Sequence, residues 1–338
     1  MSYCIAWKDK TSVFITADTA VTADRDPQSK YSSFGELHEQ HKGLVVEESL
    51  LKIAAYDSFI IGYAGEVKLA TEFIFHIKLY NGDSDLIKTV KDLVSSYNNP
   101  TTISLVIGYI RNDEPILFSY NANGDCQLII HDDLVQIGSA PEDLRLIMDF
   151  WIKYYVKVKL DSSHMLVCVN AILQNFGLFD NLMRFCIGGV FFGASVNSAG
   201  IHWQDDTSFM ILTKDAQLNG LITSISRDSA LVLSSTFFYD ETRVFFNSAT
   251  EINANDWVYK WKDIIDTYLK SGQSKFYVFF NNKFRTIIVI NTNRKTVNKY
   301  FKLETDNLGR YDFYINPNLI NEIMNPPAAN IRFKFLNG

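Results

Sequence analysis

Three residues near the start of the chain, Ser2, Asp18 and Lys52, carry side chains that suit a hydrolytic site. Removal of an initiator methionine generally requires a small second residue. Cleavage of Met1 would therefore leave a free α-amino group on the same residue as the Ser2 hydroxyl. Alone, each of the three is usually a permissive terminus or a solvated charge, and only their joint spacing favours a shared site.

Other polar clusters predict no metal and no cofactor. His38 and His41 are three residues apart, whereas the two histidines of a zinc-binding HExxH helix are four apart. The four cysteines are widely spaced and form no CxxC pair, which favours neither a zinc site nor a disulfide framework. They are Cys4, Cys126, Cys168 and Cys186. We therefore expect a reducing, cytoplasmic environment.

Composition excludes several classes of partner. The chain has 338 residues, 47% of them hydrophobic, which is enough for one large domain and a smaller one. Its net charge is only -6 and the charges are interspersed, so we expect no nucleic-acid partner. The apolar run 185–201 contains four glycines and is too short to span a bilayer, so we expect no membrane insertion.

The elements that must position these residues follow from hydrophobic periodicity. Residues 23–49 are polar and lack an apolar period, so we expect a long loop or insertion there. Strands are predicted over 2–8, 13–17, 51–55, 59–63, 103–110, 116–120, 127–130, 135–137, 190–195 and 201–203. Helices are predicted over 66–77, 86–94, 142–155 and 165–176.

The order of these elements predicts the architecture. Strands, two helices, strands, two helices and strands indicate antiparallel sheets covered by helices, and not a doubly wound parallel sheet. We expect an α+β fold, specifically a four-layer αββα sandwich, over residues 1–224. Residues 225–338 are richer in Asn, Lys and aromatic residues and predict an appended small α+β domain. Its expected elements are strands over 275–280 and 284–290 and a helix over 256–269.

The motif around Ser2 resembles the start of proteasome β subunits, which are N-terminal-nucleophile (Ntn) hydrolases. Ser2 begins a strand, the segment 17–22 closes the partner strand, and Asp18 follows the nucleophile at the interval found in those subunits. The resemblance extends over residues 2 to about 212. It includes Lys52-Ile53, Gly62-Tyr63-Ala64-Gly65 and Gly138-Ser139-Ala140.

This resemblance implies a role for each motif residue. Ser2 is the expected nucleophile, and its own α-amine, with an unperturbed pKa near 8, the expected base. Lys52 is expected to depress the pKa of that amine and Asp18 to hold Lys52 in place. The backbone N–H of Gly65 is expected to bind the oxyanion, and Ser139 to hydrogen-bond the amine.

The resemblance also implies a substrate and an assembly. Backbone groups of Thr22 and Val67 are expected to bind an extended peptide or other amide substrate. The side chains of Val21, Ala54, Tyr63 and Val67 are expected to line an apolar specificity pocket. A homo-oligomer of the proteasome kind is expected as well.

Several departures from the family pattern keep an alternative open. The gap between Asp18 and Lys52 is longer than in proteasomes, so Lys30 and Lys42 remain weaker candidates for the lysine. Arg184 stands where those subunits have an aspartate, and serine replaces their usual threonine. The alternative is a catalytically inactive Ntn-fold scaffold in which the insertion and the C-terminal domain mediate assembly.

Overall fold

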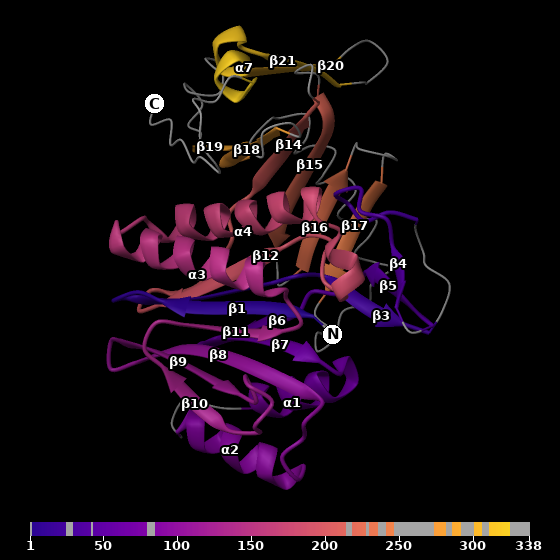
Figure 1. Ribbon diagram of the computed structural model, residues 1–338. Helices are drawn as coiled ribbons and strands as arrows, with labels where there is room; N and C mark the ends of the chain where they lie inside the picture. The colour runs from indigo at the N-terminus through magenta and orange to yellow at the C-terminus, as the bar shows by residue number, and fades with distance from the viewer. Residues whose placement is uncertain are drawn as a thin grey trace.

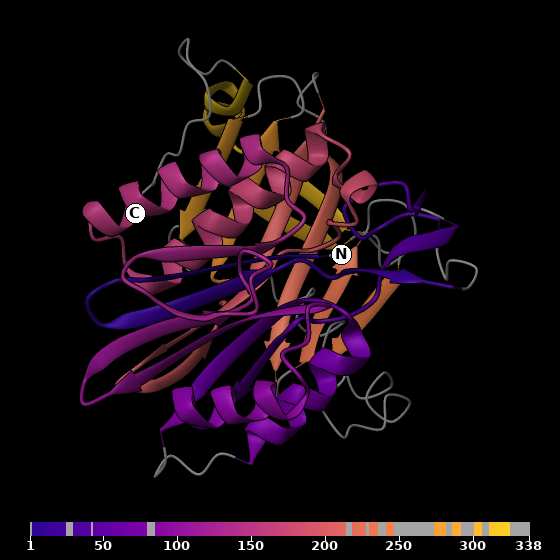
Figure 2. The ribbon, with the colours of Figure 1, turned by 60° about the horizontal axis from the view of Figure 1, so that its bottom comes forward.

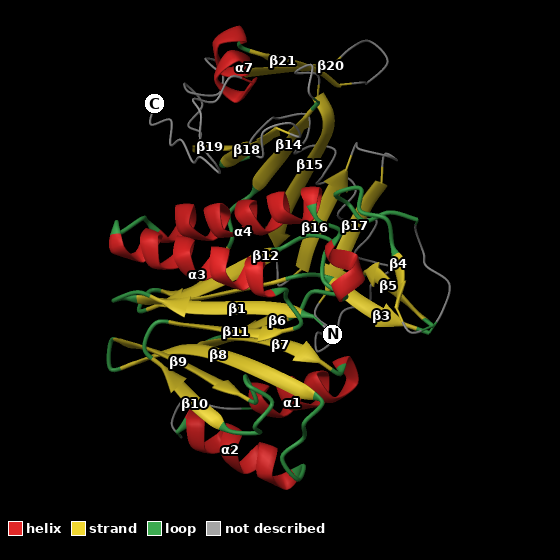
Figure 3. Cartoon of the chain, viewed as in Figure 1, coloured by secondary structure: helices red, strands yellow, loops and turns green. Residues whose placement is uncertain are grey.

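The computed structural model describes residues 2–24, 30–41, 43–79, 85–213, 218–227, 230–235, 241–246, 274–281, 286–291, 301–305 and 311–324. Over these ranges the chain has a mixed α and β architecture with several antiparallel sheets, as the α+β expectation requires (Figure 3). The helix expected over 256–269 lies outside the described residues. Among the helices in these ranges, none is both long and apolar enough to cross a membrane.

The N-terminal hairpin forms the centre of the first sheet. Its turn is closed by Asp9, whose side chain accepts hydrogen bonds from the backbone N–H groups of Thr11 and Ser12, both at 2.8 Å. The sheet has the order β11-β1-β2-β12-β13 and is antiparallel throughout. Its strands are β1 (Tyr3–Lys8), β2 (Ser12–Ala17), β11 (Leu134–Gly138), β12 (Phe192–Asn197) and β13 (Gly200–Trp203).

Two helices cover the outer face of this sheet, α3 (Glu142–Lys157) and α4 (Ser162–Phe179) (Figure 1). The helix α4 begins at Asp161, whose side chain accepts a hydrogen bond from Ser163 N–H at 3.0 Å. Its side chains are buried from 165 to 177, as expected for a helix that is apolar on all sides. It must therefore be covered on more than one face.

The second sheet has the order β10-β9-β8-β7-β6 and is also antiparallel throughout. The helices α1 (Val67–Lys78) and α2 (Leu86–Ser96) pack on its outer face. The N-cap of α2 is Asp85, which accepts a hydrogen bond from Ile87 N–H at 3.1 Å. The strands are β6 (Ile53–Tyr56), β7 (Phe59–Gly65), β8 (Ile103–Arg111), β9 (Glu114–Tyr120) and β10 (Leu128–His131).

The two sheets stack face to face through small and β-branched side chains. Ala6, Val13 and Ile15 of the first sheet belong to the same buried cluster as Ile60 and Val106 of the second. Figures 1 and 2 show the two helix pairs on opposite outer sides of this stack. The ends of β1, β2 and β11 are thereby fixed between a helix layer and a second sheet.

The polar segment 23–49 contains more regular structure than the sequence indicates. The strands β3 (Ala20–Ala23), β4 (Glu39–His41) and β5 (Leu44–Glu48) form a three-stranded antiparallel sheet in the order β3-β5-β4. The segment is therefore an insertion with strands of its own and not a long loop. Three of the five residues of β5 are apolar, and the strand pairs with β3 on one side and β4 on the other.

A six-stranded sheet, called the third sheet below, has the order β17-β16-β15-β14-β18-β19. The pair β14 and β18 is parallel, while the remaining pairs are antiparallel. The strands are β14 (Thr207–Leu212), β15 (Leu218–Arg227), β16 (Ala230–Ser235), β17 (Glu241–Phe246), β18 (Phe276–Asn281) and β19 (Thr286–Asn291). The hairpin of β20 (Phe301–Thr305) and β21 (Tyr311–Ile315) and the helix α7 (Pro317–Met324) complete the described chain.

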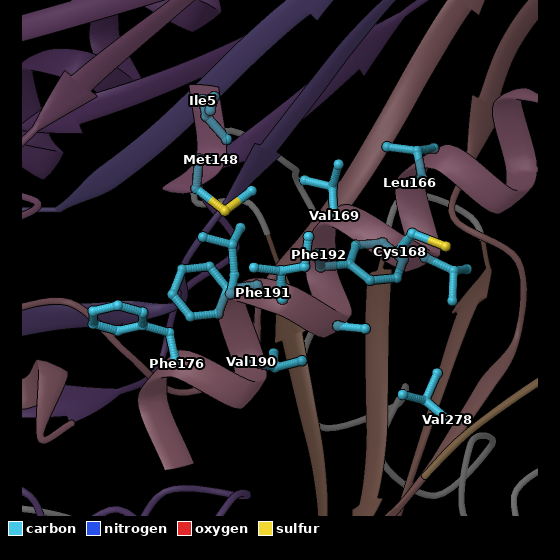
Figure 4. Close-up of a cluster of buried hydrophobic side chains, with 14 of the residues drawn as sticks. Ile5, Met148, Leu166, Cys168, Val169, Phe176, Val190, Phe191, Phe192 and Val278 are labelled. Carbon is cyan, nitrogen blue, oxygen red and sulfur yellow. The ribbon is translucent and has the colours of Figure 1, made fainter. Parts of the chain in front are cut away.

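One hydrophobic core connects this third sheet to the helix layer. Figure 4 shows Val278 of β18 in the same cluster as Cys168 of α4 and Phe192 of β12. The cluster also contains Ile5 of β1 and Met148 of α3. The helix α4 is therefore buried between the first sheet and the third. The third sheet uses strands from both sides of residue 224, and the division into two domains there stays a prediction.

Candidate functional site

The start of β1 is held by neighbours on both sides. In the register of the first sheet, Cys4 pairs with Ala17 and Tyr3 with Gly138, so Asp18 and Ser139 both lie beside the N-terminus. Tyr3 N–H donates to Asp18 Oδ1 at 3.0 Å, and Ser139 N–H donates to the carbonyl oxygen of Ser2 at 2.8 Å. Ser2 is only 2% exposed.

The predicted lysine reaches this position despite the insertion. Lys52 Nζ lies 2.7 Å from Asp18 Oδ1 and also donates to the carbonyl oxygen of Ala20. Both charged side chains are fully buried. Lys30 instead lies 5.4 Å from the ring centroid of Tyr31, and Lys42 is outside the described residues. Of the two described lysines, Lys52 is the one that pairs with Asp18.

Burial and charge act in opposite directions on this ion pair. Exclusion of water raises the pKa of the Asp18 carboxyl and lowers the pKa of the Lys52 ammonium, and the attraction between the two groups opposes both shifts. Asp18 Oδ2 also accepts a hydrogen bond from Gly188 N–H at 3.1 Å. Asp18 therefore joins Lys52, the backbone next to Ser2, and the segment that precedes β12.

Gly65 and Ser139 lie at the ends of strands that face this region. Gly65 ends β7 with a φ of +107°, and a Cβ there would be 2.1 Å from the carbonyl oxygen of Thr102. Only glycine fits this position. The hydroxyl of Ser139 donates to the carbonyl oxygen of Phe185 at 2.8 Å. Its predicted contact with the α-amine stays a prediction, as does the oxyanion role of Gly65.

The predicted substrate-binding residues divide into two groups. Val21 and Thr22 lie on β3, which is an edge strand of its sheet and has β5 as its partner among the described strands. Tyr63 and Ala54, by contrast, belong to the core beneath α1 and α2, and Tyr63 has no exposed surface. Val67 begins α1 and packs against the same core. The structure therefore does not place Tyr63 on the wall of an open pocket.

Two buried glutamates, Glu36 and Glu48, complete a network that the sequence did not predict. Three consecutive backbone N–H groups each donate to a different carboxylate. Gly188 donates to Asp18, Gly189 to Glu36 Oε2 at 2.7 Å, and Val190 to Glu48 Oε1 at 2.8 Å. The segment before β12 is thus bound to the N-terminal hairpin and to two positions in the insertion, Glu36 in its middle and Glu48 near its end.

The insertion itself is fixed by serines next to these glutamates. Ser32 Oγ donates to Glu36 Oε2 at 3.0 Å, while Ser33 donates to Glu48 Oε2 through its backbone N–H and its hydroxyl, at 2.7 and 2.8 Å. Burial is the main reason that the pKa of Glu36 rises to about 8. Glu36 Oε1 has no hydrogen-bond partner within the described chain, so no donor at this oxygen stabilises the ionised carboxylate.

Arg184 takes no part in this network. It lies in the short 3₁₀ helix Leu182–Phe185, is exposed, and stacks over Phe185 with its Cζ 4.7 Å from the ring centroid. The spacing of Glu36 and Glu48 in the sequence does not indicate that both bind the segment before β12, because only the fold brings them there.

The side chain of His41 lies outside the described residues, so the expectation that the histidine pair binds no metal stays a prediction. His38 Nε2 accepts a hydrogen bond from Glu48 N–H at 3.4 Å, which is a structural contact. Among the described residues, no three His, Cys, Asp or Glu side chains are grouped so that they could hold a metal ion. The chemistry available here is that of a buried Asp–Lys pair next to a serine.

No protein-family model matches the sequence, and no curated protein is similar to it.

Proposed function

We propose that residues 2 to about 212 form an Ntn-hydrolase sandwich of the proteasome β-subunit kind, and that Ser2 hydrolyses a peptide or other amide bond once Met1 is removed. The buried Asp18–Lys52 pair next to Ser2 carries the proposal. A buried ion pair is a weak source of stability, because desolvation of the two charges offsets their attraction. Its position beside an N-terminal serine favours a functional reason for keeping it.

In the proposed mechanism, Ser2 supplies both nucleophile and base. Its α-amine accepts the hydroxyl proton as Oγ attacks the amide carbonyl, and the departing amine of the substrate then takes up that proton. Water hydrolyses the resulting ester. The charge of Lys52 favours the neutral form of the α-amine at physiological pH, since a nearby positive charge lowers its pKa.

The surrounding elements supply the remaining functions. The N–H of Gly65 stabilises the tetrahedral oxyanion, and Ser139 binds the α-amine. An extended substrate adds to the edge strand β3 through backbone groups of Thr22, with Val21 beside it. No cofactor is required, and we place the reaction in the cytoplasm with a homo-oligomer as the working form.

A second candidate is a catalytically inactive scaffold with the same fold. Two observations favour it: Ser2 is 2% exposed, and Tyr63 is fully buried, so that the pocket expected around it is not formed by that side chain. In this case the Asp18–Lys52 pair fixes the N-terminal hairpin and has no chemical role.

Mass spectrometry of the purified protein distinguishes the two candidates. The intact mass and N-terminal residue are determined first, and the protein is then treated with a peptide epoxyketone, which reacts with an N-terminal nucleophile and its amine. The proposal predicts a chain that begins at Ser2 and gains the mass of one probe. Labelling is lost in Ser2→Ala and kept in Ser2→Thr and in Ser95→Ala, a control on α2.

Retention of Met1, or a chain that begins at Ser2 and gains no probe mass, would contradict the hydrolase proposal and support the scaffold. The variant Lys52→Met adds a second criterion. If it keeps its fold by circular dichroism and is labelled at the wild-type rate, Lys52 does not act on the α-amine.

A further inference from the structure

The exposed face of α3 carries a regular apolar stripe. Within the described chain, half of the large hydrophobic side chains that are exposed lie at every fourth position from 146 to 158. They are Leu146 (62% exposed), Phe150 (62%), Tyr154 (47%) and Val158 (50%). Residues four apart lie on one side of a helix, so these side chains form a continuous surface about 18 Å long. Exposed apolar surface of this extent is typical of an interaction site.

Charged residues lie at the two ends of the stripe and have opposite signs. Glu142 and Asp143, in the first turn of α3, are exposed and acidic, whereas Lys153 and Lys157, toward its C-terminal end, are exposed and basic. Asp143 and Lys157 are each seven residues from Phe150, nearly two full turns, and so share the face of Phe150. The face is therefore acidic, then apolar, then basic along the helix.

This pattern is complementary to itself when one copy is reversed. If two α3 helices pack antiparallel with a two-fold axis at Phe150, Asp143 of each copy faces Lys157 of the other, and Leu146 faces Tyr154. A two-fold contact uses the same patch on both subunits, so each charge pair and each apolar pair occurs twice. A parallel arrangement would place like charges against each other.

We propose that this face of α3 is the contact surface between two copies of the chain, which pack as an antiparallel helix pair about Phe150. The proposal does not depend on the hydrolase activity. The third sheet packs on α4 and leaves this face of α3 exposed, so the contact is compatible with the fold (Figure 1). One helix face is at the low end of the area of specific interfaces, so we expect a dissociation constant on the order of 1–100 μM.

Sedimentation velocity of the full chain between about 1 and 300 μM tests the proposal. The wild type is expected to pass from monomer to dimer over this range. Phe150→Asp, which brings two like charges together at the axis, is expected to weaken dimerisation at least 30-fold. Phe75→Asp on α1, where Phe75 is 45% exposed, is the matched control and is expected to dimerise like the wild type.

A charge exchange identifies the partner residues. Asp143→Lys alone and Lys157→Asp alone are each expected to weaken self-association several-fold, because each creates two like-charge contacts. An equimolar mixture of the two variants is expected to recover the wild-type affinity, since every 143–157 contact then joins opposite charges.

Several results would overturn the proposal. One is a wild-type chain that stays monomeric to 300 μM, which would assign the stripe to a different partner. Another is an oligomer that Phe150→Asp leaves unchanged, which would place the interface elsewhere. A mixture of the two charge variants that associates no better than either variant alone would exclude the antiparallel register.

Discussion

At the scale of single residues, Asp18 accepts three hydrogen bonds from three different parts of the chain. Its donors are Tyr3 N–H, Gly188 N–H and Lys52 Nζ. These donors favour the ionised carboxylate and so oppose the effect of burial, which raises the pKa of Asp18. If one donor is removed, the other two still bind Asp18, but part of the negative charge of its carboxylate is no longer compensated.

The ion pair is expected to behave differently from a surface pair when one partner is removed. Lys52→Met leaves the Asp18 carboxylate buried without its counter-ion and is expected to lower the free energy of unfolding by about 3–5 kcal/mol. The control Lys153→Met removes an exposed pair with Asp149, whose atoms are 2.9 Å apart, and is expected to cost less than about 1 kcal/mol. Urea denaturation measures both.

The double variant Asp18→Asn with Lys52→Met provides the decisive comparison. It is expected to be less destabilised than the sum of the two single variants, because no unpaired charge remains. Additive effects would show that the two groups do not interact energetically.

Glu36 predicts a specific pH dependence of stability. Its pKa rises from 4.5 to about 8 on folding, so between these values the folded chain holds a proton that the unfolded chain has released. The contribution of Glu36 to the free energy of unfolding is therefore fully present below about pH 4.5. It falls as the pH rises toward 8, by at most about 1.4 kcal/mol per pH unit. Denaturation at several pH values is expected to show a flatter profile for Glu36→Gln.

The exposed substitution Glu142→Gln serves as the control for this profile and is expected to leave it unchanged. If Glu36→Gln and the wild type lose stability in parallel between pH 5 and 8, the proton is not held at Glu36.

Sequence and structure agree in part at this scale. The structure brings Asp18 and Lys52 together as the resemblance implied, because the first and second sheets stack face to face and place the end of β2 near the start of β6. The burial of Glu36 and Glu48 was not predictable in the same way. Their side chains meet the Gly188–Val190 segment from more than 140 positions away in the sequence.

At the scale of elements, the junction of β11 and β1 fixes the N-terminus. Gly138 has a φ of +97°, and a Cβ there would be 1.8 Å from the carbonyl oxygen of Ser2. A side chain at 138 would therefore push the N-terminal residue out of its place in the sheet. Gly124 has a similar φ of +76°, but a Cβ there meets nothing within 4 Å.

A comparison of these two glycines separates the cost of a positive φ from the cost of steric overlap between a new Cβ and the backbone. Both Gly138→Ala and Gly124→Ala impose an unfavourable φ on alanine. Gly138→Ala is expected to lower the free energy of unfolding by a further 1–3 kcal/mol or so, because it also overlaps the backbone. Thermal denaturation measures the difference, and equal losses would contradict the described pairing of β11 with β1.

Helices and strands were predictable where a periodic pattern of apolar residues continues over a long segment. The side of the sheet that each side chain faces was harder to predict. The strand β7 shows the reason. Phe59, Ile61 and Tyr63 alternate with Ile60 and Ala64, and alternate residues of a strand face opposite sides. Tyr63 therefore shares the helix-covered core with Phe59, which a family pattern read position by position did not reveal. The strands of the insertion were missed because the segment is polar as a whole and its apolar run, Leu44–Val46, is short.

At the scale of the whole molecule, a shared core connects the third sheet to the first. Phe280 of β18 is fully buried, and its ring stacks on Phe209 with 6.0 Å between centroids. Phe280→Ala is expected to lower the free energy of unfolding by about 3–5 kcal/mol. Because the core is continuous through α4, hydrogen exchange is expected to accelerate in β1 as well as in β18.

The matched control is Ile130→Ala on β10, where Ile130 is 57% exposed, and it is expected to change neither rate. If β1 keeps its protection while β18 exchanges faster, the two parts unfold independently. That result would support the division near residue 224 that composition predicted.

The parallel pairing of β14 with β18 has a consequence for synthesis of the chain. Thr207 pairs with Phe276, so these partners are 69 positions apart, and the six-stranded sheet cannot be completed beyond β14 until the later strand has been made. At translation rates of about 5–20 residues per second, the ribosome needs roughly 3–14 seconds for that interval. During this time one edge of β14 has no partner. A chaperone that binds nascent chains would have its longest opportunity to act at this strand.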